Sequence, residues 1–487
     1  MDDHKAAGLK KAAIAFIDDK SDEIIDVNDQ VWAFAELSLM ETKSMALYAQ
    51  VLEKNGFIVE QGICGVPTAF SGTYGSGSPV IGILAEYDAL SGLSQESGST
   101  EEKPIVAGGT GHGCGHNMLG AGSLAAAFAV KKFLADSGAS GTVIFYGCPG
   151  EEGGAGKAFM AQKGLWESLD AALTWHPSSS NEVSSGSNNS SIQIEYRYKG
   201  IASHAAGVPH LGRSALDAVE LLNIGVQFLR EHIPDNARIH YSIIDGGGVS
   251  PNVVQPTASV LYMIRESTVH KNLDLVKRVD RIAEAAAMMT DTKLERVFID
   301  GTANIIPNNT LEKVLFKNFE EIGVPQYTEE ELAYAAKLKA TYDYIPNKLP
   351  GGATLHHPEL EQIVRELSEG GTKIINNFLI PLWHSSHQSM GSSDVADVSW
   401  QTPTAQIHVA CYPHNSPGHS WQNVSSACSA IGHKGMLTAG KVIAGAAIDL
   451  FLDPSVLEKA KEEFVSKTTD GYLCPIPDGE VPRVPGE

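Results

Sequence analysis

VIGILA, at residues 80–85, is the first of three continuous apolar runs, and TVIFYG at 142–147 and AALTW at 171–175 follow it. Such runs are typical of strands that are covered on both faces in a parallel sheet. Between the first two runs, residues 119–135 are apolar nearly all round, which predicts a buried helix. The alternation of strand and helix predicts an α/β domain whose mostly parallel mixed sheet is flanked by helices.

A different pattern starts at Ile192. Apolar and polar side chains alternate from there to Tyr198, which predicts a strand with one wet face. The segments that follow are predicted to be a helix from Leu211 to Leu229, strands near 239–244 and 257–264, a helix near 270–289 and a strand near 294–299. This β-α-β-β-α-β order matches a ferredoxin-like α+β domain. We therefore expect residues 191–305 to be inserted into a larger domain made of 1–190 and 306–487.

The C-terminal part of the larger domain has weaker signals. The run TPTAQIHVACY after Trp400 predicts another core strand, and residues 433–451 predict a final helix. Residues 340–358 read as an irregular insertion or loop. Four prolines stand in the tail after residue 470, which is expected to be extended.

Composition excludes several classes of protein. Lysine and arginine number 36 against 58 acidic residues, a net charge of −22, and no basic run is present, so nucleic acid and membrane surfaces are not expected partners. Six scattered cysteines without a CxxC spacing fit a reducing cytoplasm. The N-terminus lacks the order of a signal peptide, and the apolar run 442–452 is shorter than the ~20 residues of a membrane span. We expect a cytoplasmic protein.

GHGCGHN, at 111–117, is the strongest chemical signal. Cys114 and His116 stand two residues apart on a glycine-rich turn, so both side chains could reach one metal ion. A phosphate-binding glycine loop at a helix N-terminus is the alternative. The segment lacks the Lys-Ser/Thr pair of a P-loop and the spacing of a dinucleotide fingerprint, which favours the metal site.

PGEEGG, at 149–154, directly follows the second apolar run. Adjacent carboxylates on a loop point in different directions, so one can bind a metal while its neighbour transfers protons. Taken alone, a Glu151-Glu152 pair is more often a solvated turn. Its position at the end of a buried strand favours the functional interpretation.

His176 follows the third apolar run, where a lone histidine would usually only cap the sheet. Ligands of open α/β sheets bind beyond the carboxyl ends of the strands, however, and Glu86, Asp88, Glu151, Glu152 and His176 all follow such ends. This convergence predicts a site at that edge. Glu86 and Asp88 could be ligands there or could orient other ligands.

With these motifs the chain resembles the di-metal aminoacylase/carboxypeptidase G superfamily of metallopeptidases. The resemblance is to its amidohydrolase branch, which includes aminobenzoyl-glutamate hydrolases and indole-acetyl-amino-acid hydrolases. Nearly the whole chain is covered, in the order AEYDAL (85–90), GHGCGHN (111–117), PGEEGG (149–154), WHP (175–177), KGIASHAA (199–206), PNVV to Arg265 (251–265), GSSDVADVSW (391–400) and PGHSWQ (417–422). It implies a catalytic domain with an inserted lid and dimerisation domain.

The resemblance also implies two divalent metal ions per chain. The implied ligands are Cys114, which would bridge the two ions, His116, Glu152, His176 and His419. Glu151 would be the general base and Asp88 the catalytic aspartate. A shell of sulfur, nitrogen and oxygen donors fits zinc or manganese.

In the inserted domain, the resemblance assigns His204 to the oxyanion in the site of a partner subunit, which implies a homodimer formed through the lid. Asn252 and Arg265 would hold the carboxylate of the substrate. Without the resemblance, His204 is as readily a helix-entry residue and Arg265 a solvated charge.

The chain departs from the family pattern at three positions, and at one of them the Cys114 signature replaces the bridging acid of the peptidase branches. Glu86 stands where peptidase branches have histidine, and Asn117 stands where indole-acetyl hydrolases commonly carry aspartate. His414, shortly before His419, is a rival for the last ligand position. Ordinary surface or supporting roles are expected for His112, His384 and His387.

These expectations combine into hydrolysis of the amide bond of an N-acyl or N-aroyl amino acid by metal-activated water, with Glu151 as base. A dipeptidase or carboxypeptidase built from the same parts is the nearest alternative. A non-catalytic carboxylate-binding protein is a further alternative, but such a protein needs no general base.

Overall fold

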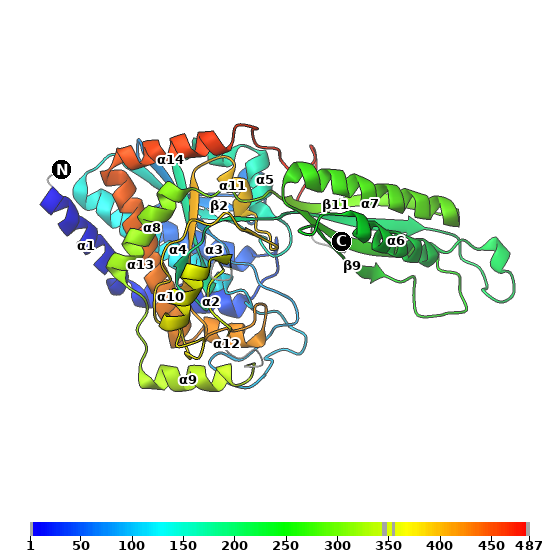
Figure 1. The fold of residues 1–487 in the computed structure, drawn as a ribbon, viewed down its shortest axis with the longest axis horizontal. Helices are drawn as coiled ribbons and strands as arrows, with labels where there is room; N and C mark the ends of the chain where they lie inside the picture. The colour runs from blue at the N-terminus through cyan, green and yellow to red at the C-terminus, as the bar shows by residue number, and fades with distance from the viewer. Residues whose placement is uncertain (1–2, 343–347, 353–355, 484–487) are drawn as a thin grey trace.

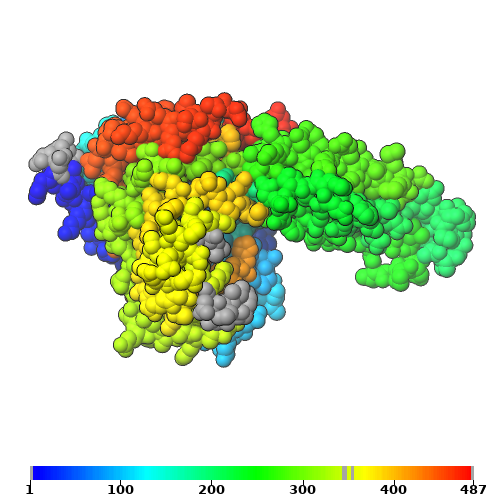
Figure 2. Space-filling view, in the orientation of Figure 1, coloured from blue at the N-terminus to red at the C-terminus, as the bar shows by residue number. Residues whose placement is uncertain are grey.

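The computed structural model describes residues 3–342, 348–352 and 356–483. A large α/β domain carries a smaller, elongated domain that extends from one side (Figure 1). The space-filling view shows this smaller domain as a green arm standing away from the main body (Figure 2).

The central sheet has the strand order β1-β2-β4-β3-β5-β13-β6. Its strands are β1 (Ile58–Gln61), β2 (Phe70–Ser76), β3 (Val80–Ala85), β4 (Gly141–Gly147), β5 (Ala171–Ser178), β6 (Glu182–Val183) and β13 (Thr404–Ala410). β4, β3, β5 and β13 pair in parallel, whereas β1, β2 and β6 join antiparallel. The predicted mostly parallel mixed sheet is therefore confirmed, and the carboxyl ends of its parallel strands share one edge.

Helices bury both faces of this sheet. The helices of the large domain are α1 (Asp3–Asp19), α2 (Ser21–Phe34), α3 (Thr42–Lys54), α4 (His116–Ser137), α5 (Gly156–Gln162), α8 (Asn309–Ile322), α9 (Glu329–Lys339), α10 (Pro358–Leu367), α11 (Val395–Ser399), α12 (Trp421–Ala427), α13 (Ala430–Leu452) and α14 (Pro454–Lys467). The successive residues Ile83 and Leu84 of β3 are both fully buried but belong to different apolar clusters, one on each face. This explains the continuous apolar run in the sequence.

α4 and α13 pack against each other at the centre of one face. Both are long and apolar enough, by length and composition alone, to cross a membrane, but 83% and 72% of their most apolar windows are buried inside the protein. The apolar run 442–452, judged too short for a membrane span, is only the second half of the 23-residue helix α13.

The inserted domain has the predicted β-α-β-β-α-β order. Its elements are β8 (Ser190–Lys199), α6 (Ala215–Leu229), β9 (Arg238–Asp245), β10 (Thr257–Glu266), α7 (Val269–Thr290) and β11 (Lys293–Thr302). They form an antiparallel sheet of order β11-β8-β10-β9, against which α6 and α7 pack. β8 leaves the large domain and β10 returns to it, so the loops after Lys199 and before Thr257 lie at the far end of the arm (Figure 1).

Two helix predictions were wrong in their limits. Leu211, expected at the start of α6, lies in a short 3-10 helix and is exposed, because α6 starts only after the Ser214 cap. α13 is not the final helix, since α14 follows it after an Asp453 cap and a proline at the first turn. In the stretch 340–358, predicted to be irregular, residues 343–347 and 353–355 lie outside the described residues.

Candidate metal centre

A tight turn sets the geometry of the GHGCGHN segment. Gly115 has a φ of 89° and precedes α4, which starts at His116, so the predicted buried helix begins three residues earlier than expected. A Cβ at Gly115 would lie 2.1 Å from the Tyr412 hydroxyl, which donates to the Cys114 carbonyl at 3.0 Å. Only glycine fits this turn, and the turn places Cys114 in the loop and His116 on the helix.

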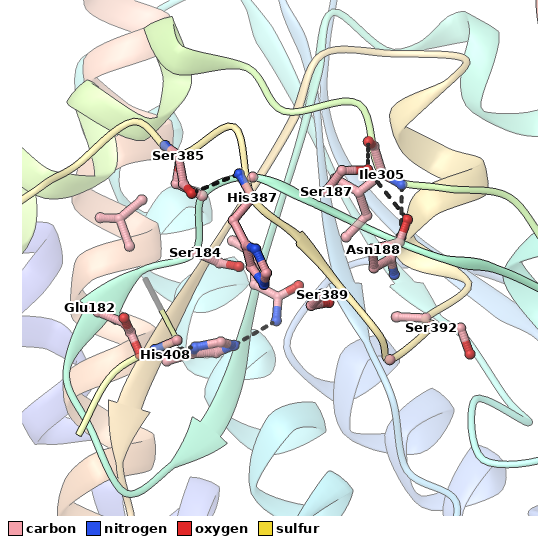
Figure 3. Close-up of a pocket in the computed structure, with 17 residues that line it drawn as sticks. Glu182, Ser184, Ser187, Asn188, Ile305, Ser385, His387, Ser389, Ser392 and His408 are labelled. Carbon is pink, nitrogen blue, oxygen red and sulfur yellow. Dashed lines mark hydrogen bonds and ion pairs between the residues drawn. The ribbon is translucent and has the colours of Figure 1, made fainter. Parts of the chain in front are cut away.

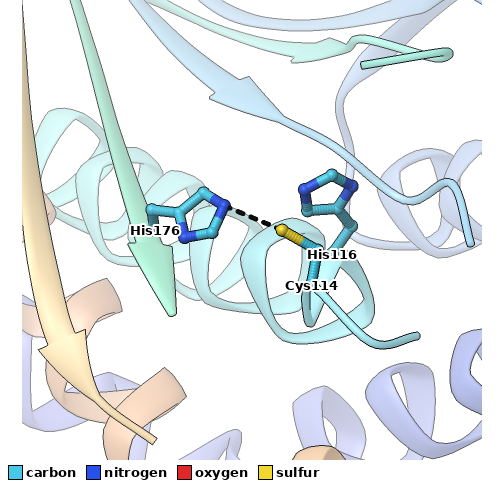
Figure 4. A group of neighbouring side chains, drawn as sticks. All are labelled: Cys114, His116 and His176. Atoms are coloured by element: carbon cyan, nitrogen blue, oxygen red, sulfur yellow. Dashed lines mark hydrogen bonds between the residues drawn. The ribbon is translucent and has the colours of Figure 1, made fainter. Parts of the chain in front are cut away.

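Two groups of possible metal ligands meet at Cys114. In the first, one donor atom each from Cys114, His116 and His176 lie within 4.8 Å of one another. The Cys114 Sγ is 3.4 Å from His176 Nε2, and His116 approaches from the other side (Figure 4). The second group joins Cys114 to Glu152 and His419, whose facing atoms are 3.4 Å apart. The structure thus brings all five predicted ligands together around one sulfur atom.

His116 is also the centre of a carboxylate cluster. Its Nδ1 lies 2.8 Å from Asp88 Oδ1, and its Nε2 lies 3.3 Å from Glu86 Oε2 and 4.0 Å from Glu151 Oε2. Asp88 also accepts the Glu152 backbone N–H at 2.8 Å. Asp88 therefore contacts both loops of the site and orients His116, as a carboxylate behind a metal-binding histidine does.

Lys157 is a part of the site that the sequence analysis missed. This lysine of α5 is completely buried, and its Nζ lies 2.7 Å from Glu86 Oε1 and 2.6 Å from Asp394 Oδ1. Asp394 also accepts the Lys157 backbone N–H. One oxygen of Glu86 is thus fixed by Lys157 while the other faces His116, so Glu86 has a partner that the sequence did not reveal.

The donor atoms of the site fit a bound cation. Glu86 Oε2, His116 Nε2 and Glu152 Oε1 are buried, and within the described chain they have no hydrogen-bond partner. Their contacts at 3.3 Å (Glu86 to His116) and 3.4 Å (Glu152 to His419) join candidate ligands to one another and are not hydrogen bonds. Buried polar atoms nearly always form hydrogen bonds, so this arrangement fits donor atoms that converge on a cation. Thiolate, imidazole and carboxylate donors together are the ligand types of zinc and related divalent ions.

Burial and neighbouring charges set the protonation of the site. Burial, together with the Glu86 and Glu152 carboxylates, raises the pKa of Glu151 well above its usual value, which suits a group that takes up and releases a proton. Burial and the nearby His116 lower the pKa of His176 to about 4, so this imidazole is neutral and free to bind a cation. Burial also raises the pKa of the Cys114 thiol, so its thiolate requires a neighbouring positive charge.

A cavity of about 410 Å³ opens onto these side chains, and its opposite wall comes from the inserted domain. Arg265, near the end of β10, lines this wall, and its buried Nε makes no hydrogen bond with any described residue. Glu151, Glu152 and His419 line the same cavity. The structure therefore places Arg265 across the cavity from the candidate metal ligands within one chain.

His204 and Asn252 lie elsewhere. Both are exposed at the far end of the arm, where His204 bridges to Val253 and the Ala205 N–H donates to the Asn252 carbonyl at 3.0 Å. Between Thr257 and Arg265, β10 runs for eight residues, about 26 Å of extended chain. The predicted pair of Asn252 and Arg265 is thus not brought together within one chain.

Three other histidines that the sequence singled out have structural partners. His414, the rival of His419, is buried, and its ring nitrogens contact Asn376 Nδ2 and the Lys348 carbonyl at 2.9 and 2.8 Å. His112 is buried against the Val31 carbonyl, and His384 pairs with Glu312. One further group of possible ligands, Asp29, Cys428 and His433, shares no residue with the site.

Asn117 faces away from the ligand groups. Its Nδ2 donates to Asn28 Oδ1 at 2.9 Å and to the Ala427 carbonyl at 3.1 Å. These bonds fasten the first turn of α4 to α2 and to the end of α12. The departure at this position therefore serves packing around the turn.

Comparisons with known proteins agree with this architecture. The chain is 42% identical to one of the subunits of p-aminobenzoyl-glutamate hydrolase from Escherichia coli (strain K12), over 96% of its own length and 98% of that protein. It is 26% identical to the Xaa-Arg dipeptidase of Mus musculus over 96% of this chain and 94% of that protein.

Solved structures show the same fold at low sequence identity. An aminobenzoyl-glutamate utilization protein from Klebsiella pneumoniae superposes with a TM-score of 0.58 at 15% identity, covering 89% of this chain and 97% of that one. A dinuclear metal-binding peptidase of the M20 family from Bacillus subtilis gives 0.55 at 16% identity, with coverages of 89% and 98%. Residues 82–423 match peptidase family M20/M25/M40. This match spans every candidate metal ligand, and the chain therefore belongs to this family of amide-bond hydrolases.

Proposed function

We propose that the protein is a metal-dependent amidohydrolase that cleaves the amide bond of N-acyl or N-aroyl amino acids, with p-aminobenzoyl-glutamate as the representative substrate. One observation carries the proposal. Two groups of ligand atoms share Cys114 on one wall of a cavity, Glu151 stands beside them, and Arg265 faces them from the opposite wall. The 42% identity to part of a p-aminobenzoyl-glutamate hydrolase supports the choice of substrate.

Two divalent ions, zinc or manganese, would be held by Cys114, His116, Glu152, His176 and His419. When bound, such ions lower the pKa of water and polarise a carbonyl oxygen. Cys114 would contribute to both ions, because it belongs to both ligand groups. Asp88 would hold His116 in the correct orientation through the contact at Nδ1.

The chain's own groups would move the proton. Glu151 takes a proton from the attacking water and returns it to the leaving nitrogen, so that a free amino acid and a free acid are released. Its raised pKa makes the carboxylate a stronger base for the first half of this transfer. Glu152, from the same turn, cannot share this task if it is a ligand.

Arg265 would recognise the free carboxylate of the amino acid. A guanidinium pairs with a carboxylate through two parallel hydrogen bonds, and the unpaired Nε of Arg265 leaves this group available. The oxyanion partner His204 would come from a second copy of the chain, since it lies at the far end of its own arm, and Asn252 would accompany it. Because His204 would act in the site of another copy, we predict a homodimer that forms through the lid domain.

The arm carries apolar side chains that suit such contact. Tyr241 and Ile243 are exposed on β9, which is the edge strand of the lid sheet, and Ile224 and Phe228 are exposed on α6. An exposed apolar edge strand is a ready template for pairing with another chain. These side chains support assembly through the lid.

The direct test is an assay of p-aminobenzoyl-glutamate hydrolysis by protein loaded with zinc or manganese, in which the released p-aminobenzoate is measured. Activity should disappear with a strong chelator and return with metal. A parallel panel should include dipeptides, because the 26%-identical relative is a dipeptidase. Binding of all compounds without turnover of any would instead favour the non-catalytic alternative and contradict the proposal.

A further inference from the structure

A second cavity of about 290 Å³ adjoins the cavity of the metal centre. Four residues line both spaces, namely Ser392, Ser393, Gln406 and His408. The His408 ring also stands edge-on to the ring of the candidate ligand His176, with centroids 6.1 Å apart. The second cavity therefore lies directly beside the candidate metal ligands.

The wall of this second cavity comes partly from the stretch that precedes β13. The short strand β12 (Gln388–Ser389) pairs in parallel with β7 (Ser187–Asn188), so that the segment 385–391 lies along 184–188. Figure 3 shows side chains from both segments around the cavity, with Glu182 and His408 in the lower part of the view. The segment 385–391 thus closes one side of a pocket that adjoins the site.

Most of the residues that line the cavity carry polar side chains, many of them serines. The hydroxyls of Ser184, Ser389 and Ser392 form no hydrogen bond with any residue that the structure describes. The described residues that line the cavity include no lysine or arginine, and Val183 and Ile305 are its main apolar members. An aliphatic group placed here would desolvate these hydroxyls without replacing their hydrogen bonds, which is unfavourable.

Glu182 gives the cavity its charge. Its Oε1 accepts the Ser180 hydroxyl at 2.8 Å and lies 3.7 Å from His408 Nδ1. On its other side, His408 Nε2 lies 3.4 Å from Gln406 Nε2. The Gly352 N–H also donates to Glu182 Oε1, at 3.3 Å. The carboxylate is therefore fixed in place, and an anionic group in the cavity would be repelled by it.

We propose that this cavity receives the acyl half of the substrate and selects acyl groups that carry a hydrogen-bond donor at their far end, such as an aromatic amine. This inference rests on the proposed function. Arg265 in the first cavity would hold the amino acid by its carboxylate, and the amide bond would lie at the candidate metal ligands between them. Glu182 is the residue that determines the preference, because it accepts from an amine and repels a carboxylate.

The test compares kcat/KM for three compounds: p-aminobenzoyl-glutamate, benzoyl-glutamate and p-carboxybenzoyl-glutamate. The wild-type protein should prefer the first over the second by about 10- to 100-fold, the worth of a hydrogen bond to a charged group, and should use the third least. Glu182→Gln should reduce the preference for p-aminobenzoyl-glutamate over benzoyl-glutamate. It should also raise kcat/KM for p-carboxybenzoyl-glutamate relative to the other two compounds. Glu463→Gln, a carboxylate fixed by hydrogen bonds on α14, is the matched control and should leave both ratios unchanged.

Equal use of the three compounds by the wild-type protein, or ratios that Glu182→Gln does not change, would overturn the inference while leaving the proposed function intact. If Glu182→Gln does not fold, Ser389→Ala on the exposed rim provides the second variant and should reduce the same preference. If no compound is hydrolysed, the proposed function fails. Calorimetric binding of the same compounds to metal-loaded Glu151→Gln protein, with and without Glu182→Gln, then still decides whether the cavity prefers the amine.

Discussion

The metal-ligand groups and the far end of the arm carry polar side chains in opposite states. Around Cys114, buried histidines and carboxylates contact one another closely, and several buried donor atoms lack a partner. At the end of the arm, His204 is exposed, and its ring Nδ1 accepts the Ala206 and Gly207 N–H groups of its own loop. The first region has the donor atoms of a metal site, and the second presents polar groups to the solvent. On the proposed function, each chain would contribute its metal ligands to one site and its His204 to the site of a second copy.

The largest effect should follow from removing the shared sulfur. Cys114→Ser should lose at least one metal ion and lower kcat/KM by about 10³-fold or more, because metal catalysis supplies several kcal/mol. Metal analysis of the purified variant and an amide hydrolysis assay provide the measurement. Cys64→Ser is the matched control, since Cys64 is a half-buried free cysteine outside the ligand groups. Full activity in Cys114→Ser protein would show that the sulfur group is not the catalytic centre.

Two neighbouring glutamates should separate metal binding from proton transfer. Glu151→Gln should keep its metal and lose ~10²- to 10⁴-fold in kcat, the usual contribution of a general base. Glu152→Gln should lose metal as well as activity, because Glu152 belongs to a ligand group. Metal content and kcat measured on the same preparations separate the two roles. If Glu151→Gln lost metal and Glu152→Gln kept it, Glu151 would be the ligand and Glu152 the general base.

Lys157 should affect stability more than any other lysine of the described chain that carries an ion pair, since its side chain has 0% exposure and lies between two carboxylates. Lys157→Met leaves Glu86 and Asp394 buried together without a cation, which should cost ~3–5 kcal/mol in the free energy of unfolding. Urea denaturation measures the loss.

The matched control for Lys157 is Lys132→Met, which removes an exposed pair with Asp136 on α4 and should change stability by less than ~1 kcal/mol. Equal stability of the two variants would mean that the buried charges are not coupled as the structure shows.

Arg265 should have the smallest effect, confined to substrate binding. Arg265→Met should raise KM by about 10- to 100-fold for a substrate with a free carboxylate, as expected for a lost charge-assisted hydrogen bond. It should change KM little for the same substrate with an amidated carboxylate. Arg197→Met, which breaks the contact with Glu195 on β8, is the control within the lid. A similar rise in KM for both substrates would assign Arg265 to lid packing.

Regular features of the fold could be predicted because burial leaves a pattern in the sequence. The strands β3, β4 and β5 were visible because both of their faces are apolar. The limits of elements were less visible, since they depend on local geometry. The start of α4 at His116 depends on the left-handed turn at Gly115, and α14 is only partly buried, with two fully or nearly buried side chains, Leu457 and Ala460.

In the candidate site, too, some features could be predicted from the sequence and others could not. The grouping of five ligands followed from the rule for strand ends and from the family resemblance. Lys157 was missed because a buried lysine looks like a solvated one in a sequence, and only the fold brings it between Glu86 and Asp394. The separation of Asn252 from Arg265 was also invisible, because the length of the arm appears only when β10 is placed in its sheet.

The central claim is that the metal centre and His204 of one active site come from different chains. Exchange of chains between two inactive variants tests this claim most directly. His204→Ala protein should keep its full metal content and lose about 10²- to 10³-fold in kcat, as for other oxyanion donors. Mixing it with Glu151→Gln protein should produce heterodimers in which one intact metal centre meets an intact His204 from the other chain, so that activity returns. Heterodimers that are demonstrably formed yet remain inactive would contradict the account, and His204 would then act only within its own chain.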